Sequence, residues 1–357
     1  MRRYVDLTVE RVDEETADSR RIALSVPENL RDTFRFVPGQ HLPVQTTIDG
    51  KPVRRTYSIC SPPGRLPLEI GVRVQPDGQF SNFVAEQLKP GDTLAVMPPF
   101  GRFHASPEHG DGRTCLMFAA GSGITPILSI MAALLESEPA TRIVLFYGNR
   151  RQGTTMFIDD LYALKNRFPS RLQLNFLFSQ EQQEFPVFSG RLDAGKVREL
   201  YRQFCSDLAP DEAFICGPDT MADVVSATLA ELGMDPAAIH TERFGAPRQR
   251  RTEQPAVIPE AGAGESQVTV IMDGHRRHFT MPQAGASVVD AAAEQGIDLP
   301  YSCKGGVCAT CRTLVRSGDV RMDSNYALEP WEVDKGYVLA CQSHPTSSEL
   351  TLDYDET

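Results

Sequence analysis

Four of the eight cysteines lie near the C-terminal end of the 357-residue chain, at a spacing that can hold an iron–sulfur cluster. Four residues separate Cys303 from Cys308, two separate Cys308 from Cys311, and Cys341 follows after twenty-nine more. In the plant-type [2Fe–2S] pattern, one tight loop supplies three thiolates and a distant segment supplies the fourth. Gly305 lets the backbone fold closely around such a cluster and direct N–H groups at its sulfur atoms. Structural zinc and free buried thiols are the alternatives, although zinc sites usually pair their cysteines at short spacing.

A glycine-rich turn follows an apolar segment near the middle of the chain. It reads Gly121-Ser122-Gly123-Ile124-Thr125-Pro126, and a half-apolar helical pattern continues after it. Glycines at a strand-to-helix turn let a pyrophosphate approach backbone N–H groups and the positive end of the helix. Pro126 stands where the dinucleotide fingerprint has its third glycine. The turn therefore predicts a nucleotide site, and an ordinary glycine-rich turn is the alternative.

Two arginines follow the next apolar segment, at Arg150 and Arg151. Dinucleotide-binding folds place at this point the group that recognises the ribose 2′ position. An acidic residue there favours NADH, whereas guanidinium groups favour the 2′-phosphate of NADPH. We therefore expect NADPH, with a solvated basic turn as the alternative.

Three shorter motifs add candidate site residues. Arg55-Thr56-Tyr57-Ser58 offers a guanidinium, an aromatic face and a hydroxyl, but so short a motif also arises by chance. Gly78 and Ser81 stand at the start of a helical pattern, where anions bind well. Cys216-Gly217-Pro218 forms a second strand-to-helix turn, in which Cys216 could also be a small buried side chain.

The hydrophobic pattern predicts three domains. Short alternating segments in residues 1–107 predict an antiparallel β-barrel. In residues 112–246, apolar strands alternate with helical windows, and this predicts an α/β domain with a parallel sheet. The composition of residues 247–266 is typical of a linker. Residues 267–357 contain two strand-like segments, one helical window and the cysteine loop, as in an α+β domain.

Charge and targeting signals narrow the class of protein. The net charge is −11, which disfavours general binding to nucleic acid. Fourteen acidic and seven basic residues lie from Glu265 onward, so the C-terminal segment carries −7 of that charge. The uncharged run from Cys115 to Leu135 is interrupted by the glycine-rich turn, so we expect no membrane span, and no signal peptide is apparent. A cytoplasmic protein with reduced thiols is the expectation.

In this order, the motifs resemble the ferredoxin–NADP reductase family fused to a C-terminal plant-type ferredoxin of β-grasp fold. The resemblance implies FAD as the flavin, a choice that the residues themselves leave open between FAD and FMN. It implies that Arg55 binds a flavin phosphate, Tyr57 covers the isoalloxazine ring and Ser58 lies near flavin N5. It also implies that Gly78 and Ser81 bind the flavin pyrophosphate. The pyridine nucleotide would be held by Gly121, Gly123, Thr125 and Pro126. The turn beside the nicotinamide would be formed by Cys216, Gly217 and Pro218. Ser58 and Cys216 are thus the candidate catalytic residues.

The ferredoxin segment is similar to the reductase subunits of ring-1,2-phenylacetyl-CoA epoxidases. The similarity extends over Cys303–Arg312, Met322–Glu329 and Gly336–Ser343. It implies electron flow from NADPH through FAD and the [2Fe–2S] cluster to a diiron oxygenase complex of phenylacetate catabolism. A flavin is needed between the two ends because a nicotinamide gives two electrons and the cluster accepts one at a time. The alternatives are the reductase of a steroid or aromatic hydroxylase, and an electron carrier that does not itself oxidise NADPH.

Overall fold

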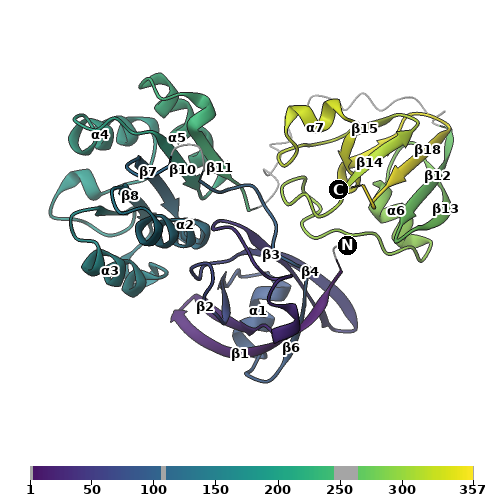
Figure 1. The fold of residues 1–357 in the computed structure, drawn as a ribbon, viewed down its shortest axis with the longest axis horizontal. Helices are drawn as coiled ribbons and strands as arrows, with labels where there is room; N and C mark the ends of the chain where they lie inside the picture. The colour runs from purple at the N-terminus through teal and green to yellow at the C-terminus, as the bar shows by residue number, and fades with distance from the viewer. Residues whose placement is uncertain (1–2, 106–109, 245–263, 357) are drawn as a thin grey trace. The chain divides into compact units, whose positions relative to one another are not determined.

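The computed structural model of the chain describes residues 3–105, 110–244 and 264–356 (Figure 1). The chain divides into two compact units. One contains residues 4–53 and 57–244, and the other contains the C-terminal segment grouped with Arg54–Thr56. The predicted linker lies outside the described residues except at its C-terminal end, where the first strand of the C-terminal segment begins at Glu265.

The N-terminal part of the first unit is a six-stranded barrel in the strand order β4-β3-β6-β1-β2-β5. In β1, Leu7 and Val9 are fully buried while their neighbours face outward, which is the alternation of a strand with one face on a core. A bridge between Ile59 and Ile70 joins the end of β4 to β5. The elements are β1 (Val5–Thr16), β2 (Ser19–Ser25), β3 (His41–Ile48), β4 (Lys51–Ser58), β5 (Leu68–Arg73), α1 (Gln79–Glu86) and β6 (Thr93–Val96).

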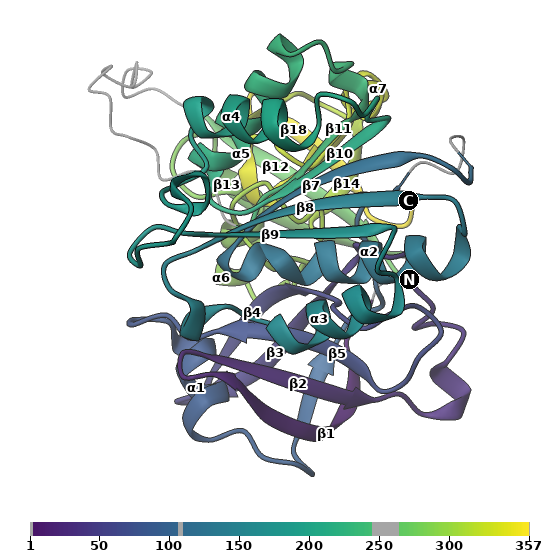
Figure 2. The same ribbon diagram turned by 90° about the vertical axis from the view of Figure 1, so that its left-hand side faces the viewer.

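The rest of this unit is a parallel sheet in the order β11-β10-β7-β8-β9, with helices on both faces (Figure 2). Alternate side chains of β7 supply the two cores: Met117 packs with α2 and α3, and Phe118 with α4 and α5. The strands are β7 (Thr114–Ala120), β8 (Arg142–Asn149), β9 (Leu172–Phe178), β10 (Glu212–Cys216) and β11 (Ile239–Glu242). The helices are α2 (Ile124–Ser137), α3 (Ile158–Arg167), α4 (Ala194–Phe204) and α5 (Asp219–Glu231).

The C-terminal segment folds around a mixed five-stranded sheet in the order β13-β12-β18-β14-β16. Its first and last strands, β12 and β18, lie parallel and side by side, and α6 packs against the sheet through Val288 and Ala292. The elements are β12 (Glu265–Met272), β13 (His275–Pro282), α6 (Val288–Glu294), β14 (Arg312–Ser317), β15 (Val320–Met322), α7 (Pro330–Asp334), β16 (Tyr337–Leu339), β17 (Ser343–Pro345) and β18 (Glu349–Asp353). The predicted barrel, parallel α/β domain and α+β domain are all present.

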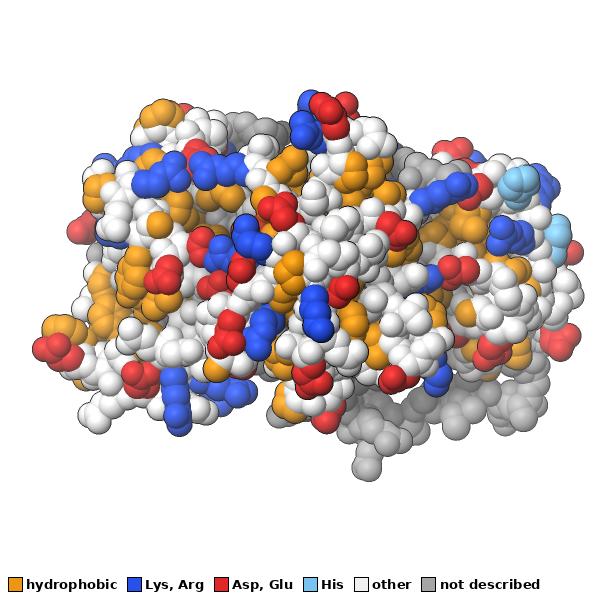
Figure 3. All heavy atoms as spheres, turned by 90° about the horizontal axis from the view of Figure 1, so that it is seen from below, with side chains coloured by type: hydrophobic (Ala, Val, Ile, Leu, Met, Phe, Trp, Pro, Cys, Tyr) orange, Lys and Arg blue, Asp and Glu red, His pale blue; other side chains and the backbone are white. Residues whose placement is uncertain are grey.

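Surface charge and helix length give two further observations. On the face seen in Figure 3, acidic and basic side chains are interspersed. None of the helices within the described ranges is both long enough and apolar enough to pass through a membrane.

Candidate functional site

The cysteine loop brings the four predicted ligands together. Backbone N–H groups donate to their sulfur atoms: Gly305 to Cys303 Sγ at 3.3 Å, and Cys341 to Cys311 Sγ at 3.5 Å. The N–H of Cys303 donates to Cys308 Sγ at 3.5 Å. Such donors stabilise the negative charge of thiolate ligands, so the loop fits an iron–sulfur cluster.

The loop backbone is shaped for this approach. Lys304 and Ala309 have φ values of +51° and +48°, a left-handed conformation that is unusual for residues other than glycine. Gly306 has a φ of +75°, and a Cβ atom there would lie 2.9 Å from the carbonyl oxygen of Ser324. A side chain at position 306 would therefore force the loop away from the segment beside it.

Hydrogen bonds from Cys308 and Cys341, together with backbone donors, hold the pKa of the Cys303 thiol well below its usual range. Over the described residues, no set of three or more Cys, His, Asp or Glu side chains is arranged to hold a single metal ion. Cluster ligands need not share one centre, because the four thiolates of a [2Fe–2S] cluster are divided between two irons.

The two predicted nucleotide turns meet at the carboxyl edge of the parallel sheet. The Gly121 turn follows β7, the Cys216 turn follows β10, and these two strands are neighbours. A Cβ atom at Gly123 would lie 2.1 Å from the carbonyl oxygen of Cys216. The chain leaves β7 in one direction across the sheet and β10 in the other, and such a switch point is where open α/β sheets bind ligands.

The side chain of Cys216 is fully buried beneath this edge. Burial raises the pKa of its thiol well above the usual value, and the nearby Glu242 carboxylate raises it further. Cys216 is therefore a neutral thiol at physiological pH. In that form it can pack against a ligand or donate a weak hydrogen bond, but it does not act as a thiolate nucleophile.

Arg150 and Arg151 follow β8 at the same edge of the sheet, and both are exposed. β8 lies next to β7, with Gly148 paired with Ala120. The arginines are thus one strand away from the Gly121 turn, in the position that the sequence motif predicts. Their recognition of a 2′-phosphate stays a prediction.

The predicted flavin residues lie on β4 and α1 of the barrel. The rings of Tyr57 and Phe80 are 5.4 Å apart, which brings the end of β4 against the first turn of α1. Ser81 Oγ accepts a hydrogen bond from the backbone of Gln75 at 3.0 Å, and a Cβ atom at Gly78 would lie 2.4 Å from that oxygen. Ser58 is buried, whereas Arg55 is exposed and donates to the carbonyl of Arg54.

Two side chains that the sequence motifs did not indicate lie beside the Cys216 turn of the nucleotide edge. His41 Nδ1 in β3 is 3.2 Å from Glu242 Oε1 in β11, and both side chains are largely buried. Glu242 pairs with Cys216 in the sheet register. Position 41 and position 242 are far apart in sequence, so no local pattern could connect them.

Comparison with known proteins assigns a family to each part of the chain. Residues 6–105 match the family described as "Oxidoreductase FAD-binding domain", and residues 117–227 match "Oxidoreductase NAD-binding domain". Residues 270–346 match "2Fe-2S iron-sulfur cluster binding domain", which decides between the cluster and the zinc alternative.

Whole-length relatives have the same combination of domains. The chain is 43% identical to a subunit of the 1,2-phenylacetyl-CoA epoxidase of Escherichia coli, over 99% of both chains. It is 34% identical to the ferredoxin reductase component of 3-ketosteroid-9-alpha-monooxygenase of Rhodococcus rhodochrous, over 99% of this chain and 97% of that one. The fold matches the solved structure of phthalate dioxygenase reductase with a TM-score of 0.59 and 22% identity, covering 98% of both chains. The chain therefore belongs to the family of oxygenase reductases that join an FAD-binding barrel, an NAD-binding domain and a C-terminal [2Fe–2S] ferredoxin domain in one polypeptide.

Proposed function

We propose that this protein is the NADPH-dependent reductase of a phenylacetyl-CoA epoxidase and supplies electrons to its diiron oxygenase component. The observation that carries the proposal is the 43% identity, over 99% of both chains, to a protein of that epoxidase. All four cluster cysteines and both nucleotide turns lie within the matched length. The oxygen chemistry is assigned to the partner, and this chain provides the route for electrons.

In this proposal the nucleotide residues divide by the part of NADPH that they hold. Gly121, Gly123, Thr125 and Pro126 receive the pyrophosphate at the start of α2, where N–H groups and the helix dipole favour an anion. Arg150 and Arg151 bind the 2′-phosphate. Cys216, Gly217 and Pro218 form the wall beside the nicotinamide, and the neutral Cys216 thiol packs there without acting as a nucleophile.

The barrel residues hold the flavin in the same scheme. Arg55 neutralises a flavin phosphate, Tyr57 covers the ring, Ser58 stands near N5, and Gly78 and Ser81 receive the pyrophosphate at the start of α1. FAD bound there would supply the conversion of a two-electron hydride into single electrons, and Cys303, Cys308, Cys311 and Cys341 would hold the cluster that takes them.

The proposal includes the domain boundaries and the location. The FAD-binding domain is assigned to residues 1–107, the NAD-binding domain to 112–246 and the ferredoxin domain to 267–357. We assign the protein to the cytoplasm, because all eight cysteines are free of disulfides and the cluster requires reduced thiols.

A Cys308→Ala variant tests the electron route. It removes one cluster ligand and leaves the flavin and nucleotide residues unchanged. We expect the variant to keep NADPH-dependent reduction of ferricyanide, which accepts electrons from the flavin, and to lose reduction of cytochrome c. If neither the wild-type protein nor Cys308→Ala oxidised NADPH, the chain would be an electron carrier reduced by another enzyme.

A second client is favoured by one observation, the 34% identity to a steroid monooxygenase reductase over 99% of this chain. Product formation with each purified oxygenase separates the two. Coupling to 3-ketosteroid-9-alpha-monooxygenase at a higher rate than to phenylacetyl-CoA epoxidase would replace the first proposal with the second.

A further inference from the structure

We infer that Tyr147 is a positioning residue that ties the Gly121 nucleotide turn to the barrel and so sets the distance over which hydride is transferred. The inference rests on the proposed function, because it assumes that the Gly121 turn holds the pyridine nucleotide. Four steps of contact connect the barrel to the turn, and each is within the first compact unit.

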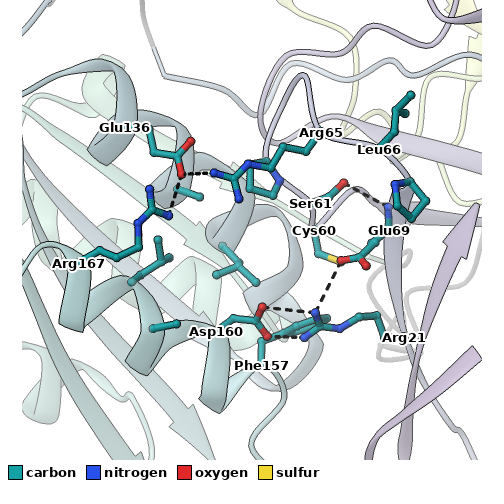
Figure 4. Close-up of a pocket in the computed structure, with 16 residues that line it drawn as sticks. Arg21, Cys60, Ser61, Arg65, Leu66, Glu69, Glu136, Phe157, Asp160 and Arg167 are labelled. Atoms are coloured by element: carbon teal, nitrogen blue, oxygen red, sulfur yellow. Dashed lines mark hydrogen bonds and ion pairs between the residues drawn. The ribbon is translucent and has the colours of Figure 1, made fainter. Parts of the chain in front are cut away.

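The first step is an ion-pair group that reaches from the barrel to α3. Arg21 of β2 pairs with Asp160 of α3 and with Glu69 of β5 (Figure 4). It also pairs with Glu15 of β1 at 2.9 Å. The guanidinium also stacks on the ring of Phe157, 4.6 Å from its centroid. The side chain of Arg21 is 18% exposed, so water only partly screens these contacts.

Phe157 is the second step, and it is held by the barrel on two sides. Its backbone N–H donates to Glu15 Oε1 at 2.7 Å, across the boundary between the barrel and the nucleotide-binding domain. Its φ is +59°, a left-handed conformation that is unfavourable for a residue with a Cβ atom and is kept here by the surrounding contacts. The side chain is fully buried.

The third step is a close approach at Gly71 of β5. A Cβ atom at Gly71 would lie 2.8 Å from the ring of Phe157 and 2.8 Å from Cγ2 of Thr125. Gly71 of the barrel strand β5 thus contacts both the ring of Phe157 and Thr125 of the predicted nucleotide turn. A side chain at position 71 would force the Phe157 ring or the Thr125 methyl group to shift.

Tyr147 completes the connection from within the nucleotide-binding domain. Its hydroxyl lies 2.9 Å from the carbonyl oxygen of Gly121 and 3.3 Å from that of Met156, the residue before Phe157. Tyr147 is fully buried, and burial raises the pKa of its hydroxyl. The hydroxyl therefore keeps its proton and can donate to either carbonyl, joining the nucleotide turn to the segment that the barrel grips.

This geometry gives a defined consequence for catalysis. Hydride transfer depends steeply on the separation of donor and acceptor, so a small shift of the Gly121 turn slows the chemical step more than it weakens binding. Removal of the Tyr147 hydroxyl takes away one buried hydrogen bond and leaves the aromatic ring in the core. The expected result is slower reduction of bound flavin with normal flavin content.

The test is anaerobic stopped-flow reduction of the full-length holoprotein by NADPH, with Tyr147→Phe compared with Tyr162→Phe. Tyr162 lies on α3 in the same domain and is 45% exposed, so it is the matched control. We expect the limiting rate of flavin reduction to fall at least about fivefold in Tyr147→Phe, the factor for a hydrogen bond of about 1 kcal/mol. FAD content and the rate of the control variant should match the wild type.

Several outcomes overturn the inference. A limiting rate of flavin reduction in Tyr147→Phe within twofold of wild type contradicts it. A loss of rate that equals the loss of FAD, or that appears equally in Tyr162→Phe, also contradicts it. If Tyr147→Phe does not fold, Phe157→Leu tests the connection from the barrel end, and a wild-type rate there also contradicts it. Failure of the wild-type flavin to be reduced by NADPH would instead contradict the proposed function.

Discussion

At the scale of single residues, the eight cysteines form two groups, four isolated thiols and four ligands of the cluster loop. Cys60, Cys115, Cys205 and Cys216 are buried thiols, and burial raises the pKa of each. The pKa reaches about 12 for Cys115 and for Cys205. In the cluster loop, backbone N–H groups donate to the sulfur atoms of Cys303, Cys308 and Cys311, and such donors stabilise the thiolate of a cluster ligand. The cysteine spacing in the sequence identified the second group. The burial of the first group could be seen only in the folded structure.

We predict that the buried thiols resist alkylation in the native protein. Cys115 has its pKa raised from 9.0 to about 12, so its thiolate fraction at pH 8 is about a thousandfold lower than that of a free cysteine. The stabilisation from the neutral thiol is present below pH 9 and is lost as the pH rises through about 12.

Iodoacetamide labelling at pH 8, followed by peptide mass spectrometry, checks this prediction. The four buried thiols should stay unmodified in the folded holoprotein and react fully in urea, which serves as the control. Rapid labelling of Cys216 in the folded protein would show that the wall beside the proposed nicotinamide site is open or ionised.

At the scale of secondary-structure elements, the contact between the turns after β7 and β10 shapes the nucleotide edge. A Cβ atom at Gly123 would meet three backbone atoms, the carbonyl oxygen and carbon of Cys216 and the nitrogen of Gly217, at 2.1, 2.5 and 2.9 Å. Backbone atoms cannot rotate away as a side chain does. The absence of a side chain at position 123 therefore allows the two turns to approach.

A Gly123→Ala variant is predicted to separate these turns. A displacement of about 1 Å between reacting groups can cost on the order of a hundredfold in rate, so NADPH-dependent ferricyanide reduction should fall by at least about tenfold. Absorbance of FAD and of the cluster should be unchanged, since their predicted ligands lie in other domains. Gly153→Ala is the matched control because a Cβ atom at Gly153 would meet no atom within 4 Å, and equal losses in both variants would contradict the prediction.

A buried ion-pair group joins the ends of three elements in the same domain. Arg113, just before β7, contacts Glu212 of β10 at 2.6 Å and also pairs with Glu138 after α2. Glu212 is fully buried, and His240 Nε2 lies 3.2 Å from its second oxygen. These contacts compensate charges that would be costly to bury alone.

Loss of one partner should therefore destabilise the domain strongly. We predict that Glu212→Gln lowers the free energy of unfolding by about 3 kcal/mol, near the lower end of the usual range because Arg113 keeps Glu138. Calorimetry should show a fall in unfolding temperature of roughly 6 °C or more. Glu231→Gln removes an exposed ion pair with Arg198 and should change the temperature little, so similar shifts in both variants would argue against a special role for burial.

The elements also show what the sequence could and could not predict. The alternation of apolar strands and helical windows in residues 112–246 predicts the parallel α/β domain, in which α3 spans Ile158–Arg167 and β9 spans Leu172–Phe178. The contacts of Tyr147 with Gly121 and of His41 with Glu242 join residues 26 and 201 positions apart. Such pairs depend on how strands from different parts of the chain align, and hydrophobic periodicity does not predict that alignment.

At the scale of the whole molecule, negative charge is concentrated in the domain that holds the cluster. The segment from Glu265 carries −7 of the net charge of −11. An uneven field of this kind speeds association with a partner of opposite charge and weakens as salt rises. We therefore expect the oxygenase component to present a basic surface to the ferredoxin domain.

Reconstitution with the purified oxygenase component of phenylacetyl-CoA epoxidase is the decisive measurement of the proposed electron route. We predict NADPH-dependent formation of epoxide product with the wild-type reductase. We predict no product with Cys308→Ala, although that variant still reduces ferricyanide. Product formation by Cys308→Ala at the wild-type rate, or none with a wild-type protein that reduces cytochrome c, would contradict the proposed route.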